Sequence, residues 1–171
     1  MLYLWQEREV NMVEKEMSFC SVIRQAQILG VFHQFVELNS SVSAKARLRN
    51  ILAFTSNIVF TIQQIFEKQY SFPLSEEEAL WVSCLIKAFL TKSTFRKRVD
   101  EITRKSLFLK QDCKCAICGK NIDVSSTIDH IIPFKYVGDE LANNLQMLCK
   151  SCNDKKNASL DYQIRFLLKL V

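Results

Sequence analysis

The chain of 171 residues has few of the residues that break secondary structure, with only three glycines and two prolines. So few breakers favour long helices over a sheet of many strands joined by tight turns. Its apolar runs are interrupted well before the length of about 20 residues that a membrane helix needs. The first residues contain no basic segment, which argues against a secretory signal. We therefore expect a mostly helical, cytoplasmic protein without a membrane span.

The seven cysteines and the net charge of +5 are more informative than these absences. In a chain without an export signal, paired cysteines bind metal more often than they form disulfides. Residues 1–95 contain nine Lys/Arg and nine Asp/Glu, whereas residues 96–171 contain fourteen and nine, so the whole excess lies in the second part. This distribution predicts a polyanionic partner such as nucleic acid.

Hydrophobic periodicity predicts a helical bundle over about the first hundred residues. Apolar residues recur with helical spacing from Val10 to Phe35, and residues 39–41 form a polar break after them. The most regular stripe runs from Leu48 to Phe66 and predicts one continuous helix, which residues 71–73 end. This stripe faces either a core or a partner.

Two further helices are expected before the composition changes. Ser75 and Glu78 form a capping-box pattern at the start of one. Thr94 is the expected cap of the other, with Val99 and Ile102 facing inward. We place a domain boundary near residue 105, which gives a helical domain over 1–105 and a small domain with a C-terminal helix over 106–171. A domain this small usually needs a staple such as a metal.

Two Cys-x-x-Cys pairs supply the candidate staple, a structural zinc. They consist of Cys115, Cys118, Cys149 and Cys152. Thirty residues separate the two pairs, so a tetrahedral zinc would clamp the ends of an inserted hairpin. Gly119 can take the positive φ that closes the first pair. Cys113 offers a competing thiol, and buried free thiols or a redox role are the alternatives for the four cysteines.

The segment between and after the pairs contains residues of a second kind of chemistry. Asp129, His130 and Asn144 lie between the pairs, while Asn153 and Lys156 follow the last cysteine. Carboxylate and amide oxygens suit a hard cation, and histidine is a proton acceptor near neutral pH. Asn143–Asn144 could instead be a simple turn.

Residues 108–157 resemble the HNH endonuclease family, whose ββα-metal motif often lies between two zinc knuckles. The resemblance implies that His130 is a general base and that Asp129 and Asn153 hold a catalytic divalent cation such as Mg²⁺ or Mn²⁺. It also implies that Asn144 fixes the loop between two strands. Asn153 stands where many members have His, a variant that active members also contain. The expected fold is α+β and mostly α, with an N-terminal helical bundle followed by a zinc-stapled ββα-metal domain.

Elementary chemistry agrees with these roles. Phosphodiester hydrolysis needs an activated water and positive charge near the reacting oxygens, and a cation with two protein ligands leaves room for both phosphate and water. Neighbouring residues point to opposite faces of a strand, so Asp129 and His130 serve one site only where the strand ends or bends. Pro133 is consistent with such an end. If a helix continues from Asn153, Lys156 lies on the same face and could contact phosphate.

The remaining basic residues are candidates for gripping the nucleic-acid backbone. They are Arg96, Lys97, Arg104, Lys105, Lys135 and Lys155. The alternative is that they are solvated helix faces. We expect DNA, most simply double-stranded, as substrate, while RNA stays open. The competing hypothesis is a zinc-stabilised DNA-binding or adaptor module that does not cleave.

The helical domain is expected to form a homodimer, contact flanking DNA or bind a regulatory protein such as an ATPase. Small proteins of the family often resemble effectors of bacterial restriction or anti-phage defence systems, so the resemblance implies this role.

Overall fold

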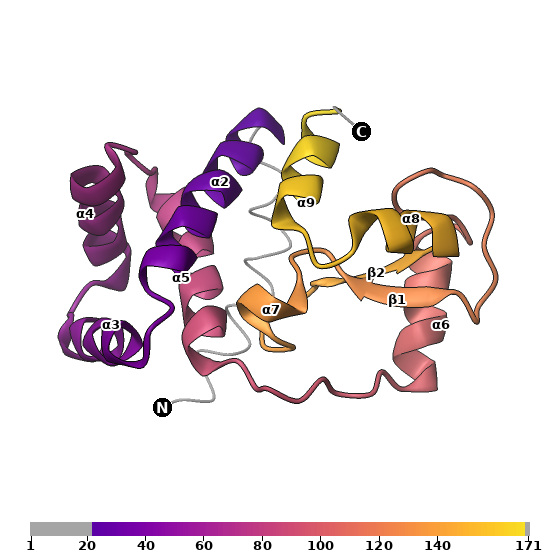
Figure 1. The fold of residues 1–171 in the computed structure, drawn as a ribbon, viewed down its shortest axis with the longest axis horizontal. Coiled ribbons are helices and arrows are strands. Elements are labelled where there is room, and N and C mark those ends of the chain that lie inside the picture. Colours follow the sequence, from indigo (N-terminus) through magenta and orange to yellow (C-terminus); the bar gives the residue numbers. More distant parts are fainter. Residues whose placement is uncertain (1–21, 170–171) are drawn as a thin grey trace. The chain divides into compact units, whose positions relative to one another are not determined.

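The structure is a computed structural model that describes residues 22–169 (Figure 1). The chain divides between Thr91 and Lys92 into two compact units. The boundary that the sequence predicts near residue 105 falls inside the helix Glu101–Lys110. The predicted helix start at Val10 lies outside the described residues. Within the described part, no helix is both long and apolar enough to cross a membrane.

The first unit is built from helices around an aromatic core. Its helices are α2 (Val22–Leu38), α3 (Val42–Phe54), α4 (Ile58–Tyr70) and α5 (Glu76–Thr91). The core centres on Phe35 of α2, which stacks on Phe66 of α4 at 5.8 Å between ring centroids and meets the edge of Phe89 of α5 at 6.5 Å. These rings are almost fully buried, so aromatic packing joins three helices that are far apart in sequence.

The predicted continuous helix over Leu48–Phe66 is wrong, because the chain breaks it into α3 and α4. Thr55 has extended backbone, and Asn57 caps the new helix by accepting the Phe60 N–H at 3.0 Å. The side chain of Asn57 thus satisfies a backbone donor that a continuous helix would have used elsewhere. Apolar spacing alone could not reveal this interruption, since the spacing carries on across it.

The predicted capping box at the start of α5 is confirmed. Ser75 Oγ accepts the Glu78 N–H at 3.2 Å, and Glu78 Oε2 accepts the Ser75 N–H at 2.9 Å. Arg24 of α2 also binds the Glu78 carboxylate, at 2.7 Å from Nε to Oε1. One carboxylate therefore caps α5 and attaches α2 to it.

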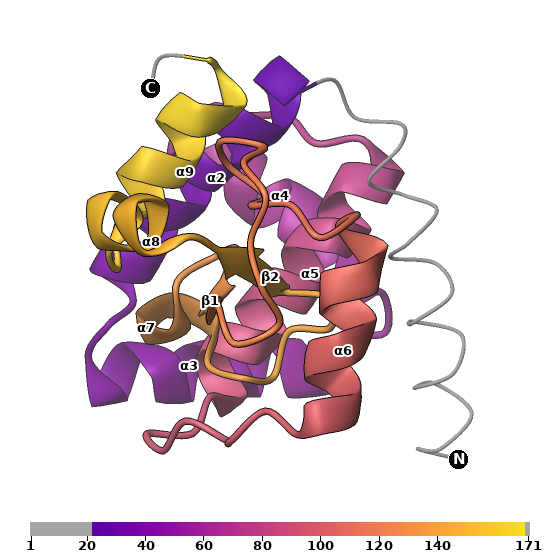
Figure 2. The ribbon, with the colours of Figure 1, turned by 90° about the vertical axis from the view of Figure 1, so that its right-hand side faces the viewer.

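The second unit is a short β-hairpin with helices packed on it, which agrees with the expected fold class. Its elements are α6 (Glu101–Lys110), β1 (Thr127–His130), α7 (Phe134–Val137), β2 (Leu145–Leu148), α8 (Lys150–Lys156) and α9 (Leu160–Leu167). The strands are antiparallel, with Asp129 opposite Gln146 and His130 opposite Leu145. Helix α6 packs on β2 and α8 packs on β1 (Figure 2). The order β1, β2, α8 is the predicted ββα arrangement.

Helix α6 begins later than the sequence suggested. Asp100 caps it by accepting the Thr103 N–H at 2.7 Å, so the prediction that Thr94 caps this helix is wrong. Ile102 was expected to face inward but is 83% exposed. The carboxylate of Asp100 is the better cap because it also attracts the positive end of the helix dipole.

The end of α6 is tied to the hairpin by a side chain. Gln111 Oε1 accepts the backbone N–H of Met147 at 2.7 Å, and Gln111 Nε2 donates to the carbonyl of the same residue at 3.0 Å. The amide group of Gln111 therefore pairs with β2 much as a neighbouring peptide group would.

Gly138 ends α7 with φ 62° and ψ −148°. Residues with a side chain rarely adopt this backbone conformation. A Cβ added at Gly138 would also lie 2.7 Å from the Cβ of Lys92. The turn thus depends on glycine for two independent reasons.

We predict that Gly138→Ala lowers the free energy of unfolding by about 1–3 kcal/mol, because it adds backbone strain and a steric clash. Thermal denaturation would measure the loss. Gly30→Ala is the matched control: Gly30 lies inside α2 with free space around it, so alanine should stabilise that helix by about 0.5–1 kcal/mol. Equal effects of the two substitutions would contradict the assigned role of Gly138.

Candidate metal centre and active site

The four paired cysteines meet in space. Their Sγ atoms all lie within 4.8 Å of one another, and those of Cys118 and Cys149 are 3.8 Å apart. Four sulfurs around a tetrahedral zinc would be about 3.8 Å apart, given zinc–sulfur bonds of about 2.3 Å. Gly119 has the expected positive φ of 69° and donates its N–H to the Cys115 carbonyl at 2.9 Å. The geometry therefore fits a structural zinc ion.

The ionisation of the thiols also favours a cation. Burial tends to raise the pKa of the Cys115 thiol, but backbone N–H groups of Cys118, Cys149 and Ile117 outweigh burial and lower this pKa to about 7. Burial and the neighbouring thiols raise the pKa of Cys152 well above its ordinary value. One thiolate thus forms readily while the next is opposed, so four thiolates together need a compensating positive charge.

The cysteine cluster is also the centre of a small apolar core. Cys115 and Cys152 are buried together with Leu148, and Ile117 and Ile122 pack against them. Among the described residues, the group of four thiols does not include Cys113. Cys113 is therefore not one of the candidate zinc ligands. A metal bound by these thiols would therefore stabilise the same point of the hairpin that the apolar core stabilises.

We predict that the purified protein contains one zinc ion per chain and that Cys152→Ser removes most of it and lowers the melting temperature. A serine oxygen cannot replace a thiolate as a soft ligand. Elemental analysis and thermal denaturation would measure both effects. Cys113→Ser is the matched control and should keep its zinc; loss of zinc from this variant would show that Cys113 is a ligand.

Two of the predicted catalytic residues, Asp129 of β1 and Asn153 of α8, line one cavity of about 500 Å³. We call it the Asp129 cavity; Arg96 and Lys135 also line it. Asn153 directly follows Cys152 in the first turn of α8, where its N–H donates to the Cys149 carbonyl at 3.0 Å. The cysteine cluster therefore sets the position of Asn153 opposite the end of β1.

Lys156 lies where a phosphate cannot reach it. Its side chain is fully buried, with Nζ 2.8 Å from Asp129 Oδ2 and 2.6 Å from the His130 carbonyl oxygen. The predicted contact with phosphate therefore does not fit this arrangement. A buried ammonium needs a charged partner, and Lys156 instead compensates Asp129 and joins α8 to β1.

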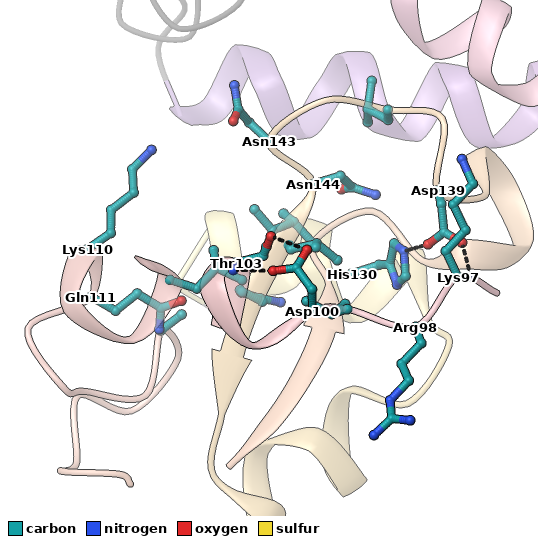
Figure 3. A pocket seen from close by; sticks show the side chains of 17 residues that line it. Lys97, Arg98, Asp100, Thr103, Lys110, Gln111, His130, Asp139, Asn143 and Asn144 are labelled. Atoms are coloured by element: carbon teal, nitrogen blue, oxygen red, sulfur yellow. Dashed lines mark hydrogen bonds and ion pairs between the residues drawn. The ribbon is translucent and has the colours of Figure 1, made fainter. Parts of the chain in front are cut away.

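His130 faces a different cavity from Asp129, as alternation along a strand requires. This cavity, of about 660 Å³, is lined by His130, Asn144, Lys97 and Asp139 among others (Figure 3). We call it the His130 cavity. His130 Nε2 lies 2.8 Å from Asp139 Oδ1, while Nδ1 is buried and has no hydrogen-bond partner in the described part of the chain. The structure thus brings Asp129 and Asn153 together but sets the imidazole on the opposite side of β1.

Asn144 holds the loop after β1. Its Oδ1 accepts the Ile132 N–H at 2.8 Å, its Nδ2 donates to the Ile132 carbonyl at 2.9 Å, and its own carbonyl accepts the Ile131 N–H at 2.8 Å. Asn143 beside it has φ 53°. Asn143 is therefore a turn position, as the alternative interpretation of the pair proposed. Asn144 is buried and makes the contacts that a loop-fixing role requires.

We predict that Asn144→Asp destabilises the second unit by about 1–3 kcal/mol, because the variant loses the donor to Ile132 and buries a carboxylate beside a carbonyl. Chemical denaturation would measure the change. Asn143→Asp, at an exposed position where aspartate tolerates positive φ, should change stability by less than about 0.5 kcal/mol. The assignment fails if the two variants are equally stable.

The candidate basic residues divide into separate groups. The guanidinium of Arg96 lies 5.1 Å from the centre of the Phe134 ring, beside the Asp129 cavity that Lys135 also lines, while Lys97 lines the His130 cavity. Lys105 and Lys155 are exposed. Arg104 Nη1 donates to the carbonyls of Val124 and Ser126, at 3.2 and 2.8 Å. Arg104 thus holds a loop of the protein itself.

Asp139 is the site residue that sequence reasoning missed. It lies nine positions after His130, in the loop that follows α7, and its Oδ2 accepts the Lys97 N–H at 2.6 Å. No motif or periodic pattern marks it, and only the folded chain brings it to the imidazole.

The second unit thus combines a hairpin followed by a helix with four clustered thiols and with one cavity that both Asp129 and Asn153 line. Residues 115–159 match the family model described as HNH endonuclease, so this segment is similar to the domain of that family. No curated protein and no solved structure gives a significant match to the chain.

Proposed function

We propose that this protein is a metal-dependent endonuclease that hydrolyses phosphodiester bonds in DNA. The observation that carries the proposal is that Asp129 and Asn153, from two different elements, line one cavity, and that Asn153 directly follows Cys152 of the cysteine cluster. Carboxylate and amide oxygens are the ligands of hard cations such as Mg²⁺ or Mn²⁺. Such a cation, held by these two residues, would supply positive charge to the phosphate oxygens.

The side chains around the Asp129 cavity suit a polyanionic substrate. Arg96 and Lys135 line it and can neutralise phosphates next to the scissile one. The buried ammonium group of Lys156 compensates the charge of Asp129. This ion pair holds the carboxylate of Asp129 toward α8. Because these contacts address the backbone and not the bases, they favour DNA binding without specifying a sequence.

His130 is the candidate base, and its place at the end of β1 makes this role possible. Asp129 and His130 are the last two residues of the strand, with Cα atoms about 3.8 Å apart. A phosphate lying over the end of the strand can therefore be approached from the Asp129 cavity on one side and from the His130 cavity on the other. A water near the imidazole would lose its proton to His130 as it attacks.

We predict that the protein nicks or cuts supercoiled plasmid in the presence of Mg²⁺ or Mn²⁺ and that EDTA stops the reaction. His130→Ala and Asp129→Asn should each lower the cleavage rate by about 100-fold or more, because one removes the proton acceptor and the other removes the negative charge that attracts the cation. Agarose gels would follow the plasmid forms over time, with a structured RNA substrate run in parallel.

Asp161→Asn is the control for these variants. Asp161 is exposed and paired with Arg165 in α9, so its substitution should leave cleavage unchanged. Zinc content and DNA affinity should also match the wild type in every variant. A wild type that binds DNA but cuts neither substrate with any divalent cation would contradict the proposal and support the non-cleaving DNA-binding module. Faster cleavage of the RNA would contradict DNA as the substrate.

A further inference from the structure

We propose that Asp139 is a positioning residue for His130, which holds the imidazole in the tautomer that leaves Nδ1 free to take a proton from water. This inference rests on the proposed nuclease function. It adds a residue that is neither one of the four cysteines nor one of the proposed cation ligands, Asp129 and Asn153.

The contact between the two side chains is short and shielded. Asp139 Oδ1 lies 2.8 Å from His130 Nε2, and the side chains are only 12% and 5% exposed (Figure 3). The edge of the Phe134 ring packs against the imidazole, with 5.5 Å between centroids. Because solvent is largely excluded, a hydrogen bond to a carboxylate fixes the ring more firmly here than on the surface.

The second oxygen of Asp139 keeps the carboxylate from rotating. Oδ2 accepts the backbone N–H of Lys97 at 2.6 Å, so the two oxygens are held by two different segments of the chain. Gly138 precedes Asp139 and adopts a backbone conformation that places it against Lys92. The carboxylate is therefore held on both sides before any substrate arrives.

An ionised carboxylate can only accept hydrogen bonds, and this fixes the tautomer of a neutral His130. The proton must reside on Nε2, and the lone pair must reside on Nδ1. Nδ1 is buried and has no partner among the described residues, although the ring lines the His130 cavity. The lone pair of Nδ1 is therefore left for a group that enters with the substrate.

In the proposed step, a water oxygen forms a bond to phosphorus while its proton passes to Nδ1, and the bond between phosphorus and the departing sugar oxygen breaks. The departing oxygen takes a proton from solvent. The resulting imidazolium stays paired with the Asp139 carboxylate until Nδ1 returns its proton to solvent. Asp139 keeps its charge throughout and stabilises the cation that forms beside it.

Nitrogen NMR tests the tautomer directly, and the chain suits the measurement because it contains only two histidines, His33 and His130. The wild type labelled with ¹⁵N should show His130 with its proton on Nε2 when neutral, and His33→Gln identifies which signals belong to His130. In Asp139→Asn this tautomer should no longer dominate, since the amide group can donate to Nε2.

We predict that Asp139→Asn lowers kcat for plasmid cleavage at least about tenfold and leaves KM within about twofold, because the base is misplaced while the DNA contacts remain. Asp139→Glu should recover part of the rate by restoring a carboxylate. Asp161→Asn is the matched control and should behave as the wild type. Zinc content and the melting curve establish that each variant is folded.

The outcomes separate this inference from the nuclease proposal. If the wild type cuts DNA and Asp139→Asn cuts equally fast, the role of Asp139 is overturned and the nuclease stands. If the wild type carries the proton on Nδ1, the positioning role is overturned whether or not any variant folds. If the wild type does not cut, the nuclease proposal fails and the positioning role fails with it, while the NMR result still shows whether the pair exists.

Discussion

The gathering of four thiols at one point is the constraint on which the second unit depends. Two short strands and a helix of seven residues bury little apolar surface, and the buried part of their core near the cluster consists of Cys115, Leu148 and Cys152. A hairpin of this size is marginal in water without additional support. A metal that joins both cysteine pairs would supply this support at the point where the hairpin meets α8.

Helix α8 connects the cysteine cluster to the proposed site. Cys152 belongs to the thiol cluster, Asn153 faces the Asp129 cavity, and Lys156 reaches back to Asp129 and to the His130 carbonyl. Two of these contacts span the gap between α8 and β1. A displacement of Cys152 would therefore move a proposed cation ligand and release a buried ammonium together, so stability and proposed chemistry are tied to the same few residues.

The sequence predicted what local spacing encodes. The Cys-x-x-Cys pairs and the box formed by Ser75 and Glu78 each depend on residues a few positions apart. The break at Asn57 was missed because the apolar stripe continues on both sides of it. The pairs His130–Asp139 and Asp129–Lys156 were missed for a different reason. Nine positions separate the first pair and twenty-seven separate the second, and only the packed chain closes these distances.

The side chains that hold the hairpin also protect its edges. Gln111 pairs with both backbone groups of Met147, and Lys156 occupies the carbonyl of His130. Exposed strand edges are templates on which a second chain can add, and natural proteins block them with covering elements or charges. Here an amide and an ammonium fill positions that a third strand would otherwise take. The two-stranded sheet can consequently stay small without inviting edge-to-edge aggregation.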